Sequence, residues 1–378
     1  MIYLDNASTT SLCSEAKEAM KNVQENVFGN PFLIHVPGCD ARKIISEARN
    51  IIAGSLNCKE SEIIFTSGAT ESINTVLKGF WSAYPKAAKR LVTTSAEHSA
   101  TLESCRYLER SGIEVIYLKP DRNALFADDQ IISVLDQKPG LLSLMHVNNE
   151  TGAMTDLRHI SELIEKYSPR TKFHVDAAQS FRKFDIDVRK SKIDFMSASA
   201  HKIHGPKGTG MLFKRSGTIL TPLIHGGNQE NGFRSGTENT LAIAGFGAAV
   251  KKAYSADHRE MIKIAEGFKQ IFTGYLSGSK RPYHINSPSD ASPYILNVSF
   301  PGIKPEVLLR ILGNSGIFVS STSACSSKSK RNSYVLKAMG YEDDIAGGAV
   351  RISFSRYNTV EEINTAALAL VSAAEGIL

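Results

Sequence analysis

The sequence predicts an α/β fold with a large domain, built around a mostly parallel sheet, and a smaller α+β domain. With 378 residues the chain is too long for one small core. Between residues 62 and 213 short apolar runs alternate with helical patterns, which is typical of βαβ units around a parallel sheet. The pattern changes after about residue 272, which indicates a smaller second domain. We expect residues 12–258 to form the large domain and residues 1–11 with 259–378 to form the small one.

The strands of the large domain are predicted in chain order. Apolar runs at residues 62–66 and 90–94 each precede a helical pattern, which begins near Thr70 in the first case and near Ser99 in the second. A long helical stretch is expected from about residue 239 to about 272. Four further apolar runs are expected to be strands, at residues 141–147, 173–175, 195–198 and 209–213.

The small domain is predicted from the remainder of the chain. Residues 277–282 are loop-like, and residues 294–300, 305–312 and 349–354 indicate a mixture of strands and helix. Residues 366–371 lie in an amphipathic helix pattern. No apolar stretch approaches the ~20 residues of a membrane span.

Composition indicates an ordinary globular enzyme, since 42% of the residues are hydrophobic and 22% are charged. The 44 Lys+Arg and 38 Asp+Glu residues give a net charge of only +6, which suits an anionic cofactor or substrate. The basic residues are scattered rather than clustered, so nucleic-acid binding is not indicated.

The five cysteines are odd in number, widely spaced and without CxxC pairs. This pattern argues against a disulfide framework and against a zinc site, so we expect no metal and a reducing compartment. The first residues lack the basic and apolar regions of a signal peptide, and a cytoplasmic location is therefore expected.

Two residues suggest covalent chemistry. Lys202 lies in a turn between two of the predicted strands, and a lysine in such a turn can form a Schiff base with a carbonyl cofactor, most commonly pyridoxal phosphate. Cys325 lies in a run of small polar residues, 320–328, where a thiol on a mobile loop can attack an activated substrate. Taken singly, such a lysine is more often solvated surface and such a cysteine is more often a small buried hydrophobic residue.

Residues 65–72 run from a strand through a turn of small residues into a helix. The backbone N–H groups of such a turn and the helix N-terminus point to one place, which is where a phosphate would bind. The alternative is an ordinary helix start capped by Thr70 or Ser67.

Asp176 ends a predicted strand, and a pyridine ring needs such a carboxylate as partner if it is to accept electrons. Gln179 follows within reach of the ring's phenolic oxygen. His98 follows another strand end and can stack on a planar ring and move protons near neutral pH. The alternatives are a helix-capping aspartate and a structural histidine.

Residues 234–239 form a loop of polar donors before a helix, which fits either a second phosphate contact or an N-cap. In residues 350–354 apolar and polar side chains alternate, so Arg351 is expected on a strand, where its guanidinium can clamp a carboxylate. Arg356 lies past the strand and is expected on the surface.

Together these motifs resemble the cysteine desulfurases of the class V aminotransferase group, which are fold type I enzymes that use pyridoxal phosphate. The resemblance covers nearly the whole chain, and so many ordered motifs make chance similarity negligible. The motifs lie at residues 3–7, 29–31, 66–71, 97–98, 146–152 and 174–179, around Lys202, at 234–239 and 323–325, and at Arg351.

The resemblance implies a role for each matching residue. Lys202 would attach the cofactor and carry protons, His98 would stack on the ring as an acid–base, and Cys325 would be the nucleophile. Asp176 would pair with the pyridine nitrogen, and Gln179 would bind the ring hydroxyl. Arg351 would bind the substrate carboxylate, and Asn149 would contact both cofactor and substrate. The phosphate would be bound by Ala69, Thr70, Ser199 and His201, and by Thr237 from the other subunit of a homodimer.

The implied reaction converts L-cysteine to L-alanine and leaves a persulfide on Cys325, from which an acceptor takes the sulfur. The acceptor stays open between an iron–sulfur scaffold, a tRNA-thiolation enzyme and a cofactor-biosynthesis protein. The spacing from Cys325 to residues 333–336 resembles the longer-loop subgroup of the family.

The chain departs from the family pattern at three places: Phe32 and Leu33 where two serines are common, Asn228 within a usual triple glycine, and Thr322 where glycine is frequent. Lys328 and Lys330 can lower the pKa of the nearby thiol or meet an acidic partner, or they can be loop charges in solvent.

Other functions share part of this pattern. A class V aminotransferase or lyase would use the same cofactor residues without needing Cys325, and a selenocysteine lyase is closer still. The protein could also be a sulfur-relay or regulatory module without catalytic activity. The presence of Lys202, Asp176 and His98 together with Cys325 argues against this hypothesis.

Overall fold

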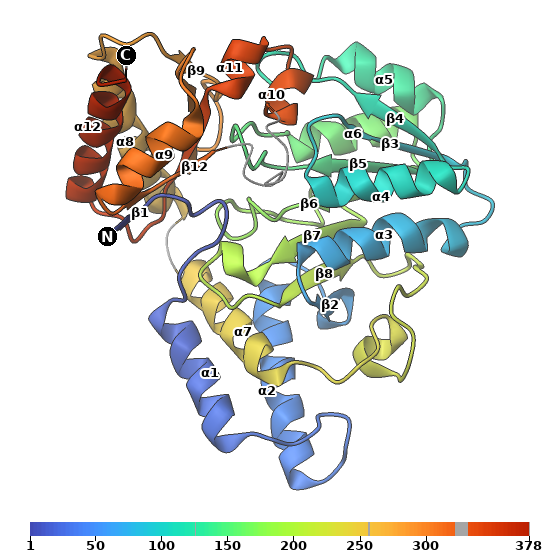
Figure 1. Cartoon of the computed structure of the whole chain (residues 1–378). Helices are drawn as coiled ribbons and strands as arrows, with labels where there is room; N and C mark the ends of the chain where they lie inside the picture. Colours follow the sequence, from blue (N-terminus) through green and yellow to red (C-terminus); the bar gives the residue numbers. More distant parts are fainter. Residues whose placement is uncertain (125, 256–257, 322–331, 378) are drawn as a thin grey trace.

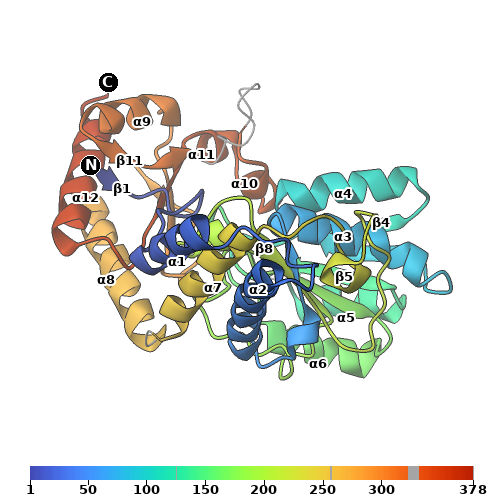
Figure 2. The same cartoon turned by 90° about the horizontal axis from the view of Figure 1, so that it is seen from below.

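The computed structural model describes residues 1–124, 126–255, 258–321 and 332–377 (Figure 1). A seven-stranded sheet and a four-stranded sheet lie side by side, and the helices α1 (Ser14–Asn26) and α2 (Val36–Gly54) lie at the bottom of the view in Figure 1; Figure 2 shows the same arrangement from below.

The large sheet consists of β2 (Ile63–Thr66), β3 (Arg90–Thr94), β4 (Glu114–Leu118), β5 (Leu141–Met145), β6 (Lys172–Asp176), β7 (Phe195–Ser199) and β8 (Gly210–Lys214). Its strand order is β2-β8-β7-β6-β5-β3-β4. Strand β8 is antiparallel to both of its neighbours, and the other neighbouring pairs are parallel. The predicted α/β fold with a mostly parallel sheet is therefore confirmed.

Helices cover both faces of this sheet, as buried parallel strands require. On one face Ile63 and Phe65 of β2 belong to a core that includes α1, α2 and three further helices. On the other face Ile64 packs against two helices that follow β2 and β3. The further helices of the first face are α5 (Asp128–Asp136), α6 (Leu157–Tyr167) and α7 (Thr240–Tyr254), and those of the second are α3 (Ala69–Ala83) and α4 (Ser99–Arg110). Short 3-10 turns are η1 (Glu60–Glu62), η2 (Ala200–Lys202) and η3 (Gln229–Gly232).

The second sheet is antiparallel, with the order β12-β13-β10-β9. Its buried face packs with α8, α9 and α12, for example through Phe272, Leu308 and Leu370. The elements of this part are β9 (His284–Ile285), β10 (Ile295–Ser299), β12 (Ser320–Ser321), β13 (Ala349–Ser353), α8 (His258–Ser277), α9 (Pro305–Asn314), α10 (Tyr334–Ala338), α11 (Asp343–Gly347) and α12 (Val360–Glu375). Within the described residues no helix combines the length and the apolar character needed to cross a lipid bilayer.

The N-terminus joins the C-terminal part of the fold. Strand β1 (Ile2–Tyr3) pairs in parallel with β11 (Ile317–Phe318), and Asp5 forms a bridge with Ser353. The chain then crosses to the large sheet, where the Thr10 N–H donates to the His201 carbonyl at 2.9 Å. This crossing carries residues 7 and 8 past the turn of Lys202.

The helices α1, α2, α5 and α6 were not named in the sequence prediction, and two further differences have a clear physical reason. Strand β4 was not predicted, because it is an edge strand whose residues Glu114 to Tyr117 are partly or fully exposed and give only a short apolar run. The single helical stretch expected over residues 239–272 is two helices, α7 and α8, with residues 256–257 between them outside the described part of the chain. Periodicity alone does not reveal such a break, because α7 is buried on nearly all sides over residues 241–250 and so has no clear apolar period of its own.

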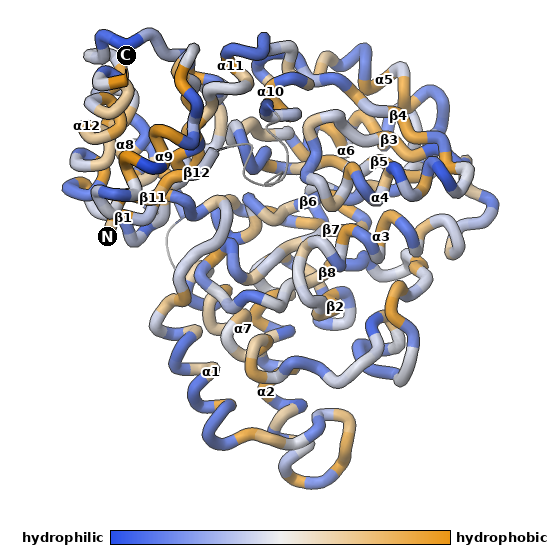
Figure 3. The backbone as a smooth tube through the Cα atoms, in the orientation of Figure 1, coloured by the Kyte–Doolittle hydropathy of each residue, from blue (hydrophilic) through white to orange (hydrophobic). Residues whose placement is uncertain are grey.

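The connection between α1 and α2 exposes large apolar side chains, and Figure 3 shows hydrophobic stretches at this tip. Phe28 and Ile34 are each 90% exposed, and the family departure Phe32-Leu33 lies between them with both side chains exposed. Contiguous exposed apolar residues of this kind mark a contact surface for another molecule.

Candidate functional site

A cavity of about 310 Å³ opens at the carboxyl ends of the parallel strands, the usual ligand position in α/β sheets. We call it the strand-end cavity. The structure brings together here most of the residues that the sequence singled out: Ala69, Thr70, His98, Asn149, Asp176, Gln179, Ser199, His201, Lys202 and Arg351. Thr237 is exposed in the loop before α7 and is not among the residues that line the cavity. Cys325 and Thr322, together with Lys328 and Lys330, lie outside the described residues.

Lys202 ends the short turn η2, which directly follows β7. Its Nζ donates to the carbonyl oxygens of Ala7 at 2.6 Å and Ser8 at 2.8 Å. The N-terminal crossing segment therefore holds the amine at the cavity wall. In the sequence only the family resemblance points to residues 3–7, because residue types do not indicate which backbone carbonyl will accept a hydrogen bond from a lysine.

Asp176 ends β6 and is 3% exposed. Its Oδ1 accepts the Ala178 N–H at 2.9 Å, a turn contact rather than the helix cap of the alternative hypothesis. Burial raises the pKa of this carboxyl group, and the nearby His98 partly opposes that rise. Lys202 also acts on this carboxyl group through its charge, and a cationic group of a ligand would further satisfy the buried acid.

His98 is at once a cavity residue and the N-cap of α4. Its Nδ1 accepts the Ala100 N–H at 3.1 Å, so the proton of the neutral ring resides on Nε2. Burial lowers the pKa of His98, against the opposing influence of Asp176. The ring is therefore predominantly neutral at neutral pH and carries one N–H that is not committed to the cap.

The N-terminus of α3 faces the same cavity. Gly68 caps it with φ 155° and without a side-chain hydrogen bond, so neither Thr70 nor Ser67 is the cap that the alternative required. The Ala69 N–H donates to Ser199 Oγ at 2.7 Å. A helix start without a side-chain cap is a ready anion site, because its N–H groups and dipole favour negative charge.

His201 lines the same cavity as this helix start. Its Nδ1 is 3.1 Å from Thr9 Oγ1, and burial together with Lys202 lowers its pKa to about 4. His201 is therefore uncharged at neutral pH and contributes a hydrogen bond rather than a charge.

Arg351 lies on β13, as predicted, and is 6% exposed. It donates from Nη2 to Asp5 Oδ1 at 2.8 Å and to Ser8 Oγ at 2.6 Å, and from Nη1 to the Asn149 carbonyl at 2.8 Å. Its Nε and the Asn149 Oδ1 are buried, and neither has a hydrogen-bond partner within the described part of the chain. Buried polar atoms are almost always satisfied, so these two atoms indicate a polar ligand.

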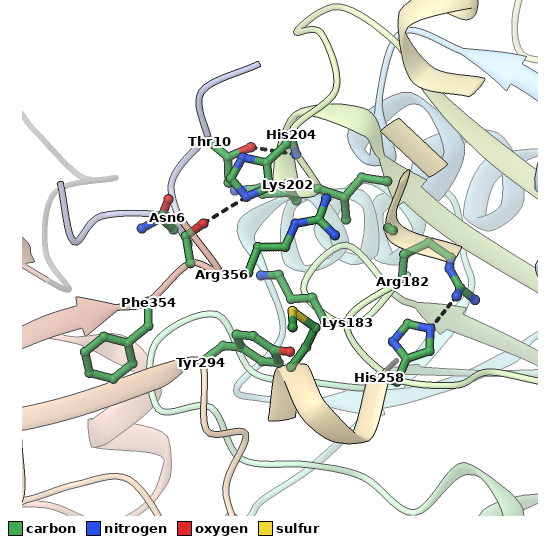
Figure 4. A pocket seen from close by; sticks show the side chains of 14 residues that line it. Asn6, Thr10, Arg182, Lys183, Lys202, His204, His258, Tyr294, Phe354 and Arg356 are labelled. Carbon is green, nitrogen blue, oxygen red and sulfur yellow. Dashed lines mark hydrogen bonds between the residues drawn. The ribbon is translucent and has the colours of Figure 1, made fainter. Parts of the chain in front are cut away.

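The expectation that Arg356 lies on the surface was wrong. The residue is half-buried, and its Nε and Nη2 are enclosed without a partner among the described residues. It lines a second, smaller cavity behind Lys202 (Figure 4), because the chain turns inward after β13 rather than outward.

Gln179 completes the wall beside Lys202. Its Nε2 donates to the Ala7 carbonyl at 2.8 Å, the same oxygen that receives Lys202. The side chain is 5% exposed, and its Oε1 is 3.4 Å from Lys183 Nζ.

The segment of Cys325 begins and ends beside the cavity, although residues 322–331 are not described. Before it, Ser320 of β12 pairs with Arg351. After it, the Ser333 hydroxyl donates to Glu150 Oε2, next to Asn149, and the Tyr334 hydroxyl donates to the Glu97 carbonyl at 2.8 Å. Sequence reasoning missed Glu150 and Ser333, whose pairing over 183 residues has no local signal.

The departure at Asn228 causes no backbone strain, because its φ of −93° is one that any residue adopts. Left-handed φ values follow instead at Glu230 and Asn231. Among the described residues no group of three His, Cys, Asp or Glu side chains is arranged to hold a metal ion.

Comparison with known proteins gives consistent relatives. The family model for class V aminotransferases matches residues 2–365. The chain is 39% identical over 364 residues to "Cysteine desulfurase IscS" of Dictyoglomus turgidum, covering 96% of this chain and 92% of that protein. A solved structure described as "NIFS-LIKE PROTEIN" superposes with a TM-score of 0.92 at 36% identity, covering 98% of each chain. Another, "SspA in complex with cysteine", gives 0.83 at 34% identity over 95% of this chain and all (100%) of that one.

Proposed function

The chain belongs to the class V aminotransferase family and is a cysteine desulfurase, and we propose that it works with pyridoxal phosphate attached to Lys202 and passes the sulfur of L-cysteine first to Cys325. The observation that carries the proposal is the convergence of Lys202, Asp176 and Arg351 on one cavity from three distant parts of the chain. Each of the three supplies a different charge or nucleophile that this chemistry needs.

The residues of the strand-end cavity fit the proposed cofactor. Its phosphate would bind at the uncapped start of α3, with Thr70, Ser199 and His201 as hydrogen-bond donors. Its pyridine nitrogen, when protonated, would pair with Asp176, which satisfies that buried acid. Gln179 would bind the ring hydroxyl. When bound, pyridoxal phosphate supplies the electron sink for the charge left on the substrate's Cα.

The chain's own residues then have distinct tasks. The Lys202 amine, oriented by the Ala7 and Ser8 carbonyls, attaches the cofactor and moves the substrate's α-proton. His98 would lie against the ring of the bound cofactor, with the proton on its Nε2 available for transfer. Arg351 donates from Nε to the substrate's carboxylate. Asn149 accepts a hydrogen bond from the substrate's ammonium group at Oδ1, which has no other partner in the described part of the chain.

Cys325 is proposed as the sulfur acceptor within the enzyme. In sum, L-cysteine and the Cys325 thiol give L-alanine and a Cys325 persulfide, so the sulfur atom is inserted between Sγ and its proton and no external oxidant is needed. The anchoring of both described ends of its segment, at Arg351 and at Glu150, supports a reach into the cavity. A partner protein for iron–sulfur cluster assembly or tRNA thiolation would then take the sulfur.

A homodimer is part of the proposal. Thr237 is exposed and outside the cavity of its own chain, which suits a phosphate contact made to the other subunit. The apolar tip between α1 and α2 supplies a surface that such an association would bury. The division into residues 12–258 and residues 1–11 with 259–378, and a cytoplasmic location, are likewise proposed on the sequence grounds above.

The test is a product assay. Purified protein loaded with pyridoxal phosphate is given L-cysteine and a thiol reductant, and alanine and sulfide are quantified. Equal amounts of the two products support the proposal, whereas pyruvate, or alanine without sulfide, contradicts it. The same assay with selenocysteine as the only substrate distinguishes a selenocysteine lyase, which would turn over selenocysteine and leave cysteine unchanged.

A further inference from the structure

The second cavity, behind Lys202, has a volume of about 50 Å³ (Figure 4). We call it the rear cavity. Of the described residues, Lys202 alone lines both cavities, so its side chain separates them. The walls of the rear cavity come from the N-terminal crossing segment, the turn after β6, the residues after η2, the helices α7 and α8, the residue before β10 and the segment after β13. Besides Lys202, the polar and aromatic members are Asn6, Thr10, Arg182, Lys183, His204, His258, Tyr294, Phe354, Ser355 and Arg356.

The rear cavity is cationic. Besides Lys202 it is lined by Arg182, Lys183 and Arg356, and no Asp or Glu is found among its described lining residues. Enclosed positive charge is costly unless a counter-charge accompanies it. Figure 4 shows the side chains of Lys183 and Arg356 extending into the same space beside Lys202.

Arg356 is the clearest indication of a ligand. Its Nε and Nη2 are buried and have no acceptor in the described part of the chain, although a guanidinium presents five N–H donors. Its guanidinium carbon is 5.2 Å from the centroid of the Tyr357 ring, and this contact satisfies the face of the guanidinium rather than its N–H groups.

Lys183 is the second indication. The nearest oxygen described for its Nζ is Gln179 Oε1 at 3.4 Å, and the Tyr294 ring centroid lies at 5.8 Å. Burial first, and then Lys202 and Arg351, lower the pKa of this ammonium group to about 7. Each of these influences would be offset by an anion beside Nζ.

His204 and Arg182, which also line the cavity, already make hydrogen bonds to the protein. His204 donates from Nδ1 to the Ser11 carbonyl at 2.9 Å, and its Nε2 accepts the Ser355 hydroxyl at 3.0 Å. Burial lowers the pKa of His204 to about 4, so it adds no charge at neutral pH. Arg182 donates to the Ser55 carbonyl at 3.1 Å and to His258 Nε2. Arg356, with two buried N–H groups that have no acceptor in the described part of the chain, and Lys183, whose described acceptor lies 3.4 Å away, are therefore the two cations that face a ligand most directly.

We propose that the rear cavity binds one small inorganic anion between the Arg356 guanidinium and the Lys183 ammonium group. A water molecule needs roughly 10–15 Å³ of such volume. The cavity therefore has room for a halide or a tetrahedral oxyanion, while a nucleotide is excluded by size. The site is distinct from the phosphate position at α3, which lies across Lys202 in the strand-end cavity.

The test measures anion binding by thermal unfolding of the cofactor-loaded protein. At fixed pH and ionic strength, potassium gluconate is replaced stepwise by the chloride, bromide, sulfate or phosphate salt, and the unfolding midpoint is recorded. We expect at least one of the four anions to raise the midpoint saturably, because a ligand of the native state stabilises it by mass action. Arg356→Gln and Lys183→Met should each raise the half-saturating concentration at least tenfold.

Arg310→Gln is the matched control, since it removes the same charge from an exposed position on α9 and should leave the half-saturating concentration unchanged. The proposal is overturned if none of the four anions gives a saturable rise with the unmodified protein, or if all variants respond alike. Should Arg356→Gln fail to fold, Lys183→Met still decides. In crystals grown with the effective anion, the ion should lie within hydrogen-bond distance of Arg356, and an ion found only elsewhere rejects the site.

Discussion

Replacing Arg351 with alanine should weaken use of L-cysteine far more than replacing Arg356. Three of the bonds that Arg351 makes are to Asp5, Ser8 and Asn149, and they engage Nη1 and Nη2. Nε is the buried donor left for a substrate carboxylate among the described contacts. Loss of one hydrogen bond between charged groups costs about 1.5–3 kcal/mol. At about 1.4 kcal/mol per factor of ten, kcat/KM should fall roughly 10- to 150-fold.

The assay records the rate of alanine formation against L-cysteine concentration, with reductant present and the cofactor content of each variant matched by absorbance. The loss should appear mainly as a raised KM, because the carboxylate contact is made in the ground state as well as in the transition state. Arg356→Ala should change KM less than threefold, since that side chain lines the rear cavity. Asp5→Asn is the control for a misplaced guanidinium, because it weakens the Asp5 contact that orients Arg351 but keeps the positive charge of Arg351. Equal KM values in the two arginine variants would refute the assignment of Arg351.

Four further outcomes are expected. Lys202→Ala should abolish turnover, since among the described residues Lys202 is the amine held at the Ala7 and Ser8 carbonyls, and a retained rate of alanine release would contradict this. Asp176→Asn should fold normally but lower kcat at least tenfold, because a neutral amide cannot hold the ring's proton; unchanged kcat would remove Asp176 from the site. Cys325→Ser should bind cofactor and substrate, seen as an absorbance change on adding L-cysteine, yet release no sulfide. Mass spectrometry of the unmodified protein, given L-cysteine without reductant, should map one added sulfur to Cys325, and an added sulfur on another cysteine would contradict its role. Burial raises the pKa of Glu150 from 4.5 to about 7, so the folded state binds the extra proton between those values and stability falls as pH rises through them. The free energy of unfolding of Glu150→Gln, relative to that of the unmodified protein, should therefore increase between pH 4.5 and 7 and stay constant above pH 7. The total increase should reach up to ~3 kcal/mol, at ~1.4 kcal/mol per unit of pKa shift. A difference in unfolding free energy that is the same at every pH would disprove this.

The sequence predicted the strands next to the site well, because they are buried throughout and give uninterrupted apolar runs. Strand β3 matches its predicted limits, and β2, β6 and β7 differ by one or two residues. Strand β4 could not be predicted in this way, because it is a half-exposed edge strand and lacks an uninterrupted apolar run. Ten predicted site residues share the strand-end cavity, since carboxyl ends of parallel strands meet at one edge of a sheet.

Long-range contacts could not be predicted in the same way. Asp5 and Arg351 are 346 residues apart, and Ala7 and Lys202 are 195 apart. Both contacts depend on β1 pairing with β11, after which the chain crosses to the large sheet. Backbone carbonyls such as those of Ala7 and Ser8 are present at every position, so residue types carry no mark of which ones will orient a lysine.

By itself the sequence determined the family, the fold class and the chemical groups of the site, because these follow from residue types, their order and the periodicity of apolar positions. The tertiary structure alone decided how those groups are used. It committed His98 Nδ1 to the cap of α4, left Nε of Arg351 for a ligand, and turned Arg356 inward beside Lys183. The physical reason is that hydrogen-bond partners and burial are set by which distant segments pack together, and local patterns contain no information on that packing.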